Sequence, residues 1–65
     1  MITVNGEPRE VTAGTTLAAL VTALTAARSG VAVAVNDEVV PRGDWPSRRL
    51  GDGDRVEVLT AVQGG

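Results

Sequence analysis

Neither cysteine nor histidine occurs among the 65 residues of the sequence. Without cysteine there are no disulfides, no thiolate metal site and no thiol nucleophile. Without histidine the chain lacks the commonest general base and the commonest metal ligand. The two serines, Ser29 and Ser47, therefore have no histidine or lysine to activate them, and nucleophilic catalysis is not expected.

Lysine is absent too, so all six basic residues are arginine, and the net charge is −2. A negatively charged chain is a poor ligand for nucleic acid, which binds to basic surfaces. No apolar run approaches the roughly 20 residues that cross a bilayer, and the N-terminus lacks the pattern of a signal peptide. We therefore expect no nucleic-acid partner, no membrane partner and a cytoplasmic location.

The start of the chain predicts a β-hairpin. Residues 2–4 alternate between apolar and polar and run into Asn5-Gly6. Asn-Gly is the strongest short hairpin signal, because a type I′ turn needs positive φ at both central residues. The return strand is expected at 9–12, with Pro8 at its start, where a missing N–H does little harm.

A helix is predicted after Gly14. Thr15 or Thr16 offers the N-cap, and Gly30 is placed to end the helix. Arg28 suits the negative end of the helix dipole. Apolar residues recur at i, i+3, i+4 and i+7, which makes one apolar stripe along the helix: Leu17, Leu20, Val21 and Leu24.

The second half of the chain predicts three more strands. Residues 31–35 read Val-Ala-Val-Ala-Val, a well-buried strand that we expect to run parallel to the first strand after a right-handed crossover. Asn36-Asp37 is a turn signal before a short strand at 38–40. The stretch 42–50 is polar and irregular, and 55–60 is a last strand with a period of two.

This order of elements predicts an α+β protein of the β-grasp, or ubiquitin-like, fold. A mixed sheet of four to five strands would carry one helix across one face. Residues 1–60 would form the domain, and 61–65 a flexible Gly-Gly tail. The predicted core consists of the apolar residues that face the helix, namely Ile2, Val4, Val11, Leu17, Leu20, Val21, Leu24, Val31, Val33, Val35, Val56 and Val58.

Asp52 and Asp54 are paired carboxylates that could in principle act as an acid–base pair or bind a cation. Asp-Gly-Asp is more often turn chemistry that starts a strand, and we prefer that interpretation. Gly51 and Gly53 precede a strand rather than a helix, so they form no phosphate loop. We expect no catalytic residue, no metal site and no bound cofactor, and hence no enzyme.

The chain ends in Gly64-Gly65, which adds no side-chain packing. A frayed end is one interpretation. The other follows from shape, because five residues beyond Thr60 reach about 17 Å and two glycines can thread a narrow channel. A carboxylate on such a thread can enter the active site of another protein and be activated with ATP as an acyl-adenylate.

Several segments share the pattern of one known family. They are Val-Pro-Arg-x-x-Trp at 40–45, Leu-x-Asp-Gly-Asp-x-Val-Glu-Val at 50–58 and Ala-Val-Gln-Gly-Gly at 61–65, with weaker matches at 4–7 and 14–17. Over its full length the chain resembles the ThiS family, the sulfur carriers of thiamin biosynthesis. The Gly-Gly end is shared with ubiquitin-like modifiers and with the small subunit of molybdopterin synthase. The Val-Pro-Arg-x-x-Trp segment points to ThiS in particular.

The resemblance implies a mechanism for the chain end. A ThiF-type adenylyltransferase would use Mg-ATP to adenylate the carboxylate of Gly65, with Gly64 as the thread. A sulfur donor protein would supply the sulfur that makes a thiocarboxylate. A ThiG-type thiazole synthase would then take up this sulfur to build the thiazole ring.

Three other functions stay open from the residues alone. The chain could serve molybdopterin synthesis with the same tail chemistry and a different acceptor. It could be a protein modifier that forms isopeptide bonds to lysines of other proteins. It could also be a plain β-grasp binding module with an inert tail.

The surface that partners would use is predicted from the last strand. Leu59 points outward and could form an apolar docking patch with Val62, or be an ordinary exposed leucine. Gln63 is a further candidate for partner binding. Trp45 could anchor a partner, but we prefer a place at the core edge for the only aromatic side chain. The pair Arg48-Arg49 is expected to be solvated, with docking of an acidic partner as the alternative.

Overall fold

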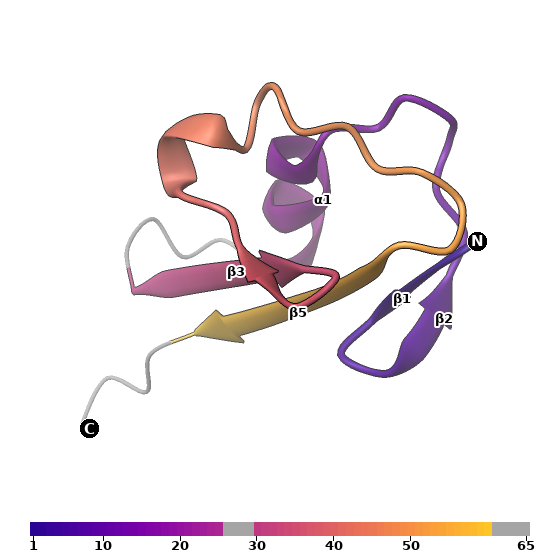
Figure 1. Cartoon of the computed structure of the whole chain (residues 1–65), viewed down its shortest axis with the longest axis horizontal. Helices are drawn as coiled ribbons and strands as arrows, with labels where there is room; N and C mark the ends of the chain where they lie inside the picture. The colour runs from indigo at the N-terminus through magenta and orange to yellow at the C-terminus, as the bar shows by residue number, and fades with distance from the viewer. Residues whose placement is uncertain (26–29, 61–65) are drawn as a thin grey trace.

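In the part of the chain that the structure describes, one mixed β-sheet carries one α-helix across one of its faces (Figure 1). The computed structural model describes residues 1–25 and 30–60. The α+β, β-grasp arrangement predicted from the sequence is confirmed. In chain order the elements are β1 (Ile2–Val4), β2 (Glu7–Arg9), α1 (Leu17–Leu24), β3 (Val31–Val35), β4 (Glu38–Val39), the 3₁₀ helix η1 (Arg42–Asp44) and β5 (Arg55–Thr60).

The last strand lies at the centre of the sheet. The strand order is β2-β1-β5-β3-β4, with β5 parallel to β1 and antiparallel to β3. The prediction that β3 runs parallel to the first strand is therefore wrong. The crossover through α1 starts from β2, which is antiparallel to β1, so it delivers β3 parallel to β2 instead. β1 obtains its parallel neighbour from β5.

Two type I′-like turns make the hairpins at the sheet edges. Asn5 and Gly6 have φ of 50° and 83°, and Asn36 and Asp37 have φ of 51° and 70°, as the turn signals predict. The predicted return strand at 9–12 is displaced. A two-residue turn places Glu7 directly opposite Val4, the last residue of β1. Because β1 has only three residues, the pairing ends where Arg9 lies opposite Ile2.

Pro8 consequently lies in the middle of β2 rather than at its start, opposite Thr3. This position is tolerated because β2 is an edge strand, where a proline can leave its missing N–H on the open side.

Helix α1 starts as predicted and ends earlier. Thr16 is the N-cap, and its Oγ1 accepts a hydrogen bond from the Ala19 N–H at 3.2 Å. The predicted stop at Gly30 is wrong, because the helix ends at Leu24 and Thr25 is already extended, with φ −151°. A β-branched residue loses side-chain freedom in a helix, which favours this early exit. The predicted position of Arg28 lies outside the described residues.

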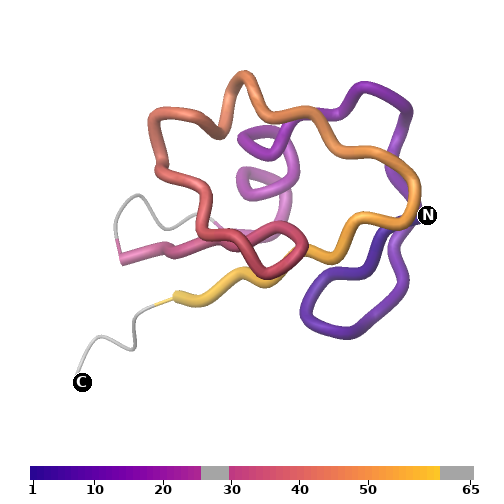
Figure 2. The backbone as a smooth tube through the Cα atoms, in the orientation of Figure 1, coloured from indigo at the N-terminus to yellow at the C-terminus, as the bar shows by residue number. Residues whose placement is uncertain are grey.

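The segment 40–50 is more ordered than its polar sequence suggests. It forms η1 and then passes the N-terminal end of α1, along the top of the molecule in Figure 2. There the Leu17 N–H donates to the carbonyl of Arg48 at 2.7 Å and the Ala18 N–H donates to the carbonyl of Trp45 at 3.1 Å. These bonds satisfy two of the free N–H groups that every helix start leaves.

The hydrophobic core fills the space between the sheet and α1. Trp45 and Leu50, each 5% exposed, join it from the segment after β4, which confirms the preferred place of Trp45. Leu50 is a core residue that the sequence interpretation missed. Of the predicted core, four residues pack only at its margin, namely Val11, Leu24, Val31 and Val58. In the part of the chain described, no helix has the length and apolar character to cross a membrane.

Candidate functional site

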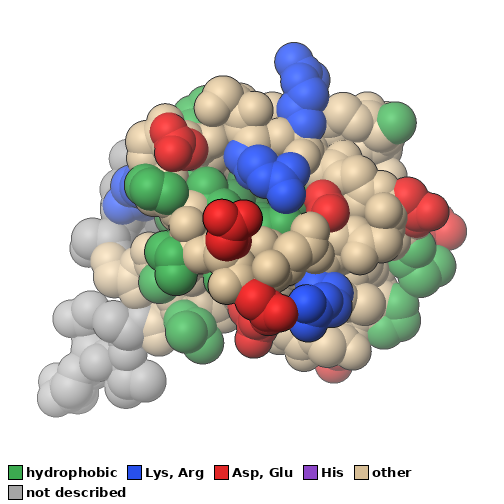
Figure 3. Space-filling view, in the orientation of Figure 1, with side chains coloured by type: hydrophobic (Ala, Val, Ile, Leu, Met, Phe, Trp, Pro, Cys, Tyr) green, Lys and Arg blue, Asp and Glu red, His purple; other side chains and the backbone are tan. Residues whose placement is uncertain are grey.

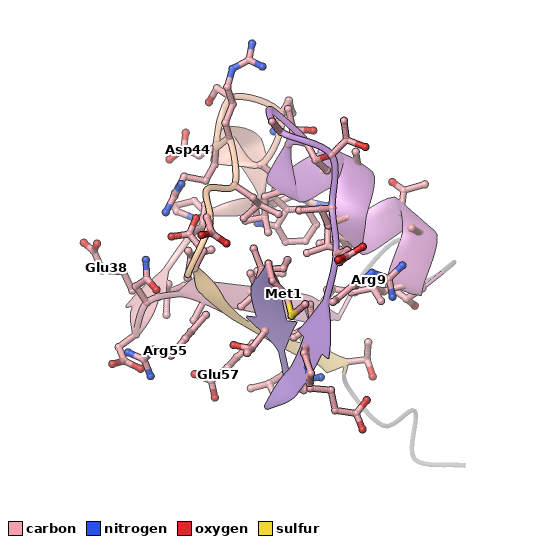
Figure 4. The ribbon with its side chains drawn as sticks, turned by 90° about the vertical axis from the view of Figure 1, so that its right-hand side faces the viewer. Met1, Arg9, Glu38, Asp44, Arg55 and Glu57 are labelled. Carbon is pink, nitrogen blue, oxygen red and sulfur yellow. The ribbon has the colours of Figure 1, made fainter. Side chains whose placement is uncertain are left out.

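Strand β5 sorts its side chains onto two faces of the sheet, as its period of two predicts. Val56 is 1% exposed and points toward the helix, whereas Leu59 is 69% exposed. Arg55 and Glu57 project from the face opposite α1 (Figure 4). Four further candidate residues, Val62, Gln63, Gly64 and Gly65, lie outside the described residues. β5 is therefore the element that connects the folded body to the candidate reactive end.

The face of the sheet opposite α1 carries an apolar patch, which we call the open-face patch: Ala32, Ala34, Val39 and Leu59. Ala32 is opposite Leu59 on neighbouring strands, and Ala34 is opposite Val39, which is 77% exposed. Figure 3 shows hydrophobic side chains along the left-hand side of the molecule, with acidic and basic side chains among them. Glu57 lines the same hollow as the patch, which thus has an apolar centre beside a charged group, as is typical of a protein interface.

Sequence reasoning found only Leu59 of the open-face patch. The strand 31–35 is predicted to be well buried, with its valines in the core. Its residues alternate instead, with Val33 and Val35 in the core and Ala32 exposed. The signal that could have revealed the patch is the alternation of valine with the smaller alanine. In a sheet with one helix-covered face, alternate residues of a strand lie on the covered and on the open face, so the alanines of this strand share the open face.

An ion pair borders the open-face patch. The Arg55 Nη2 donates to the Asp37 carboxylate at 2.8 Å. The hydrogen bond from Arg55 to Asp37, with the attraction of the same carboxylate, raises the pKa of the arginine above its ordinary value. Both side chains are largely exposed, so the pair orders the edge of the patch and adds little stability.

Asp54 fixes the turn that leads into β5. Its carboxylate accepts hydrogen bonds from the Gly51 N–H at 2.8 Å and from the Asn36 side-chain amide at 3.0 Å. The bond from Gly51, followed by the bond from Asn36 and the charge of Arg48, lowers the pKa of Asp54 below its usual value. The neighbouring Asp52 pairs instead with the N-terminal ammonium group, which lowers its pKa.

The two aspartates thus have separate structural partners and form no acid–base pair, as the turn interpretation predicts. Within residues 1–25 and 30–60, no three potential ligands among histidine, cysteine, aspartate and glutamate come together as a metal site.

The amide side chain of Asn5 holds the outer part of β5. Its Nδ2 donates to the carbonyl of Val58 at 3.2 Å, and its Oδ1 accepts from the Val58 N–H at 2.8 Å. The side-chain amide therefore acts as one more peptide group after β1 has ended. It holds β5 at Val58, two residues before Thr60, where the described part of the strand ends.

The Val-Pro-Arg-x-x-Trp segment has a structural role in this molecule. The indole Nε1–H of Trp45 donates to the carbonyl of Val40 at 2.9 Å, and the Arg42 guanidinium lies 5.2 Å from the ring centroid. Because the ring is buried, it cannot anchor a partner without leaving the core. The motif ties η1 to α1, on the covered side of the sheet, away from the open-face patch.

Arg48 and Arg49 contact their own chain. The Arg49 Nη1 donates to the carbonyl of Gly14 at 3.3 Å, and Arg48 lies 3.8 Å from the Asp54 carboxylate. The Arg48 contact braces the turn before β5, and the Arg49 contact joins the segment before α1, so the two arginines have separate partners within the chain.

Comparison with known proteins identifies the family. The sequence model of the ThiS family matches residues 2–65, almost the whole chain and including both terminal glycines. The chain belongs to the ThiS family. Two sulfur carrier proteins ThiS are among its relatives. The protein of Thermus thermophilus is 42% identical over 100% of both chains, and that of Escherichia coli is 31% identical over 94% of this chain and 92% of its own.

The fold of the ThiS family agrees with the structure. The crystal structure of the thiamine biosynthesis protein ThiS from Geobacter metallireducens has a TM-score of 0.80 at 36% identity, with 98% of this chain and 97% of that chain covered. A thiazole synthase of Magnetococcus marinus also matches, at 42% identity over 98% of this chain. The matched part is only 20% of that thiazole synthase, so the resemblance concerns one segment of a longer protein.

Proposed function

We propose that this member of the ThiS family is a sulfur carrier of thiamin biosynthesis whose reacting group is the carboxylate of Gly65. The observation that carries the proposal is the family match, which continues through the described body into residues 61–65. The chain acts as a carrier and co-substrate, since Asp52 and Asp54 have structural roles and the sequence offers no nucleophile with a base.

The proposed chemistry takes place at one carbonyl carbon. The Gly65 carboxylate attacks the α-phosphorus of Mg-ATP in a ThiF-type adenylyltransferase, and pyrophosphate leaves. A sulfur nucleophile at the oxidation level of sulfide, supplied by a sulfur donor protein, then attacks the acyl-adenylate. The new C–S bond forms as the C–O bond to AMP breaks, which leaves a thiocarboxylate. Activation is needed because a free carboxylate is a poor electrophile.

Thiazole synthase of the ThiG type is the proposed acceptor. Sequences similar to this chain occur as one-fifth of longer thiazole synthases from Magnetococcus marinus and Paramagnetospirillum magneticum. A carrier segment within the same polypeptide as a synthase supports a direct contact between the two. The thiocarboxylate sulfur attacks an electrophilic carbon of the thiazole precursor, and water then cleaves the acyl–sulfur bond and restores the carboxylate.

The open-face patch is the proposed docking surface for these partners. Leu59 and Val39 supply its exposed apolar area, and Leu59 is one residue from the end of the described part of β5. Docking there places a partner next to the start of residues 61–65, with Val62 and Gln63 as further contacts. Apolar side chains at the centre of an interface carry most of its binding energy.

Intact-mass spectrometry tests the proposed chemistry. The protein is incubated with a ThiF-type adenylyltransferase, Mg-ATP and sulfide. We expect one oxygen to be replaced by one sulfur, located at Gly65 by fragmentation. Replacing Gly64 by Val, or adding one residue after Gly65, should abolish the change, because a β-carbon or an extra residue keeps the carboxylate from the reacting phosphate. Unaltered conversion in either variant would contradict the threading mechanism.

The same samples separate the alternative functions. Transfer of sulfur to the large subunit of molybdopterin synthase, with none to thiazole synthase, would assign the carrier to molybdopterin synthesis. Thiol-resistant conjugates of high mass would identify a protein modifier instead. Full cellular function after removal of Gly65 would leave only a binding module with an inert tail.

A further inference from the structure

Strand β5 extends beyond its neighbour β1, so none of the described strands lies beside the last part of its β1-side edge (Figure 1). Successive residues of a strand direct their backbone N–H and C=O groups to opposite sides. The Thr3 N–H donates to the carbonyl of Asp54 at 3.0 Å and the Asn5 N–H to that of Val56 at 2.8 Å, so the even-numbered residues face β1. The odd-numbered residues face β3, as the bond from the Asn36 N–H to the carbonyl of Arg55 shows.

Thr60 is the next even-numbered residue after Val58. By this alternation its backbone N–H and C=O point to the β1 side, while its neighbour Leu59 pairs with Ala32 of β3. The side chain of Asn5 already satisfies Val58 on the β1 side. Over the described ranges, 1–25 and 30–60, no group bonds to the backbone of Thr60 on that side. With respect to the described residues, the edge therefore offers one donor and one acceptor without a partner, in strand geometry.

A groove lies beside this free edge. It has a volume of about 350 Å³ and lies between the β1–β2 hairpin, the end of α1 and the end of β5. Val4, Leu24 and Val58 line it with apolar groups, and Thr60 is at its border on β5. Arg9 extends from β2 toward the end of α1 (Figure 4), and Glu7 adds the opposite charge. A groove with mixed charges and an apolar floor suits a peptide better than an anion.

We propose that an extended segment of the adenylyltransferase that receives the tail adds to β5 at Thr60, as a short extra strand beside the Asn5 side chain. The identity of that protein rests on the proposed function. An unpaired strand edge is a ready template for another backbone, and added strands bind through main-chain hydrogen bonds while side-chain pockets select the sequence. The groove beside Thr60 would take one side chain of the added segment. This contact is separate from the open-face patch.

The added strand would orient the chain at the point where residues 61–65 begin. Residues 61–65 follow β5 directly, so a partner backbone bonded to Thr60 grips the chain at the point where the tail starts. Orientation of a reacting group within its site raises the reaction rate, because less translational and rotational entropy is then lost at the reaction step. The open-face patch supplies the affinity for the partner, and the edge of β5 orients the chain where residues 61–65 begin.

The variant Thr60→Pro removes the proposed donor and leaves the β3 side intact. The lost N–H is the one that faces away from β3, and the residue before a proline prefers the extended conformation that Leu59 already has. Thr60→Ala is the matched control, because it trims the side chain and keeps the N–H. We expect Thr60→Pro to weaken binding to the ThiF-type adenylyltransferase by roughly three- to tenfold relative to Thr60→Ala, as for one lost hydrogen bond.

Hydrogen exchange of the unmodified protein provides a second measurement that does not depend on the proline variant folding. The Thr60 amide should exchange fast in the free protein and at least about tenfold more slowly in the complex. Equal affinities of the two variants, or an unchanged exchange rate, would overturn the proposal. So would self-association of the free chain that disappears in Thr60→Pro, since the edge would then serve a second copy.

The mass measurement keeps this inference distinct from the proposed function. Conversion of Gly65 to a thiocarboxylate with no effect at Thr60 would reject the added strand and retain the sulfur carrier. Protection of the Thr60 amide by a partner without conversion of Gly65 would retain the added strand and reject the sulfur carrier.

Discussion

At the scale of single residues, two turn asparagines have a second role that connects distant parts of the chain. Asn5 and Asn36 take positive φ in their turns, and both also bond to β5 with their side chains. Asn36 accepts from the Arg55 N–H at 2.9 Å and donates to Asp54. The turns were predictable because Asn-Gly and Asn-Asp pairs are local signals. The side-chain bonds were not, because they join residues far apart in sequence.

Asp54 is the residue whose charge has the clearest effect on stability. Its lowered pKa means that the folded protein holds the ionised carboxylate more strongly than the unfolded chain does. The resulting stability is fully present above the ordinary pKa of the side chain and is lost as the pH falls through the lowered value. We expect Asp54→Asn to reduce the free energy of unfolding by about 1–2 kcal/mol at neutral pH.

Urea titrations that follow the fluorescence of Trp45 measure this effect, since the chain has no other aromatic residue. From about pH 4 downward the stability of the original protein should fall and approach that of Asp54→Asn. Asp52→Asn is the matched control, because its side chain is 87% exposed and its partner is the chain terminus. An equal loss in both variants would rule out the role of Asp54 in the turn.

At the scale of elements, the sequence predicted which segments form strands and the helix better than it predicted how they pair. The bounds of β3 and β5 were correct, because valine-rich runs with a period of two are strong local signals. The neighbour of β3 was wrong, because the direction of a crossover depends on the strand from which it departs. The end of α1 was wrong because alanines favour a helix locally, whereas the return to the sheet requires an earlier exit at Thr25.

The short helix depends on its cap. With only eight residues, α1 is too short to be stable in isolation, so its first turn needs outside partners. Replacing Thr16 by Ala removes the acceptor of the Ala19 N–H and should destabilise the protein by about 1 kcal/mol.

Thr16→Ser is the control for this cap, since it keeps the hydroxyl and should retain most of the stability. Thermal unfolding followed by circular dichroism compares the two variants. A transition temperature of Thr16→Ala equal to that of Thr16→Ser would show that the hydrogen bonds from 45–48 suffice at the helix start.

At the scale of the whole molecule, one cluster of ten buried hydrophobic residues, counted over 1–25 and 30–60, forms the core of the fold. A domain of this size has little excess stability, so the removal of one core side chain has a large effect. Leu17 is 0% exposed at the start of α1. We expect Leu17→Ala to lose about 2–5 kcal/mol, which would leave much of the protein unfolded.

Leu59→Ala is the matched control on the opposite side of the sheet. The side chain is 69% exposed, so its removal should hardly change the free energy of unfolding in urea. It should instead weaken binding to the adenylyltransferase or the thiazole synthase, measured by calorimetry. Loss of stability without loss of binding would remove Leu59 from the docking surface.

The candidate site was only partly predictable because it depends on the order of the strands in the sheet. The exposure of Leu59 follows from the period of β5, but the open-face patch also needs Ala32 and Val39 from two other strands. Their meeting depends on strand order, which the local pattern does not contain. The roles of Gly64 and Gly65 stay predictions, since these residues lie outside the described part of the chain.

The central position of β5 has a consequence for how the protein is made. The hairpin β1–β2 and the hairpin β3–β4 do not pair with each other, and only β5 joins them into one sheet. A nascent chain on the ribosome therefore has two separate hairpins and an incomplete core until residues 55–60 leave the exit tunnel. Folding must follow synthesis of the last strand, so the complete sheet exists only when the segment leading to the candidate reactive end has been translated as well.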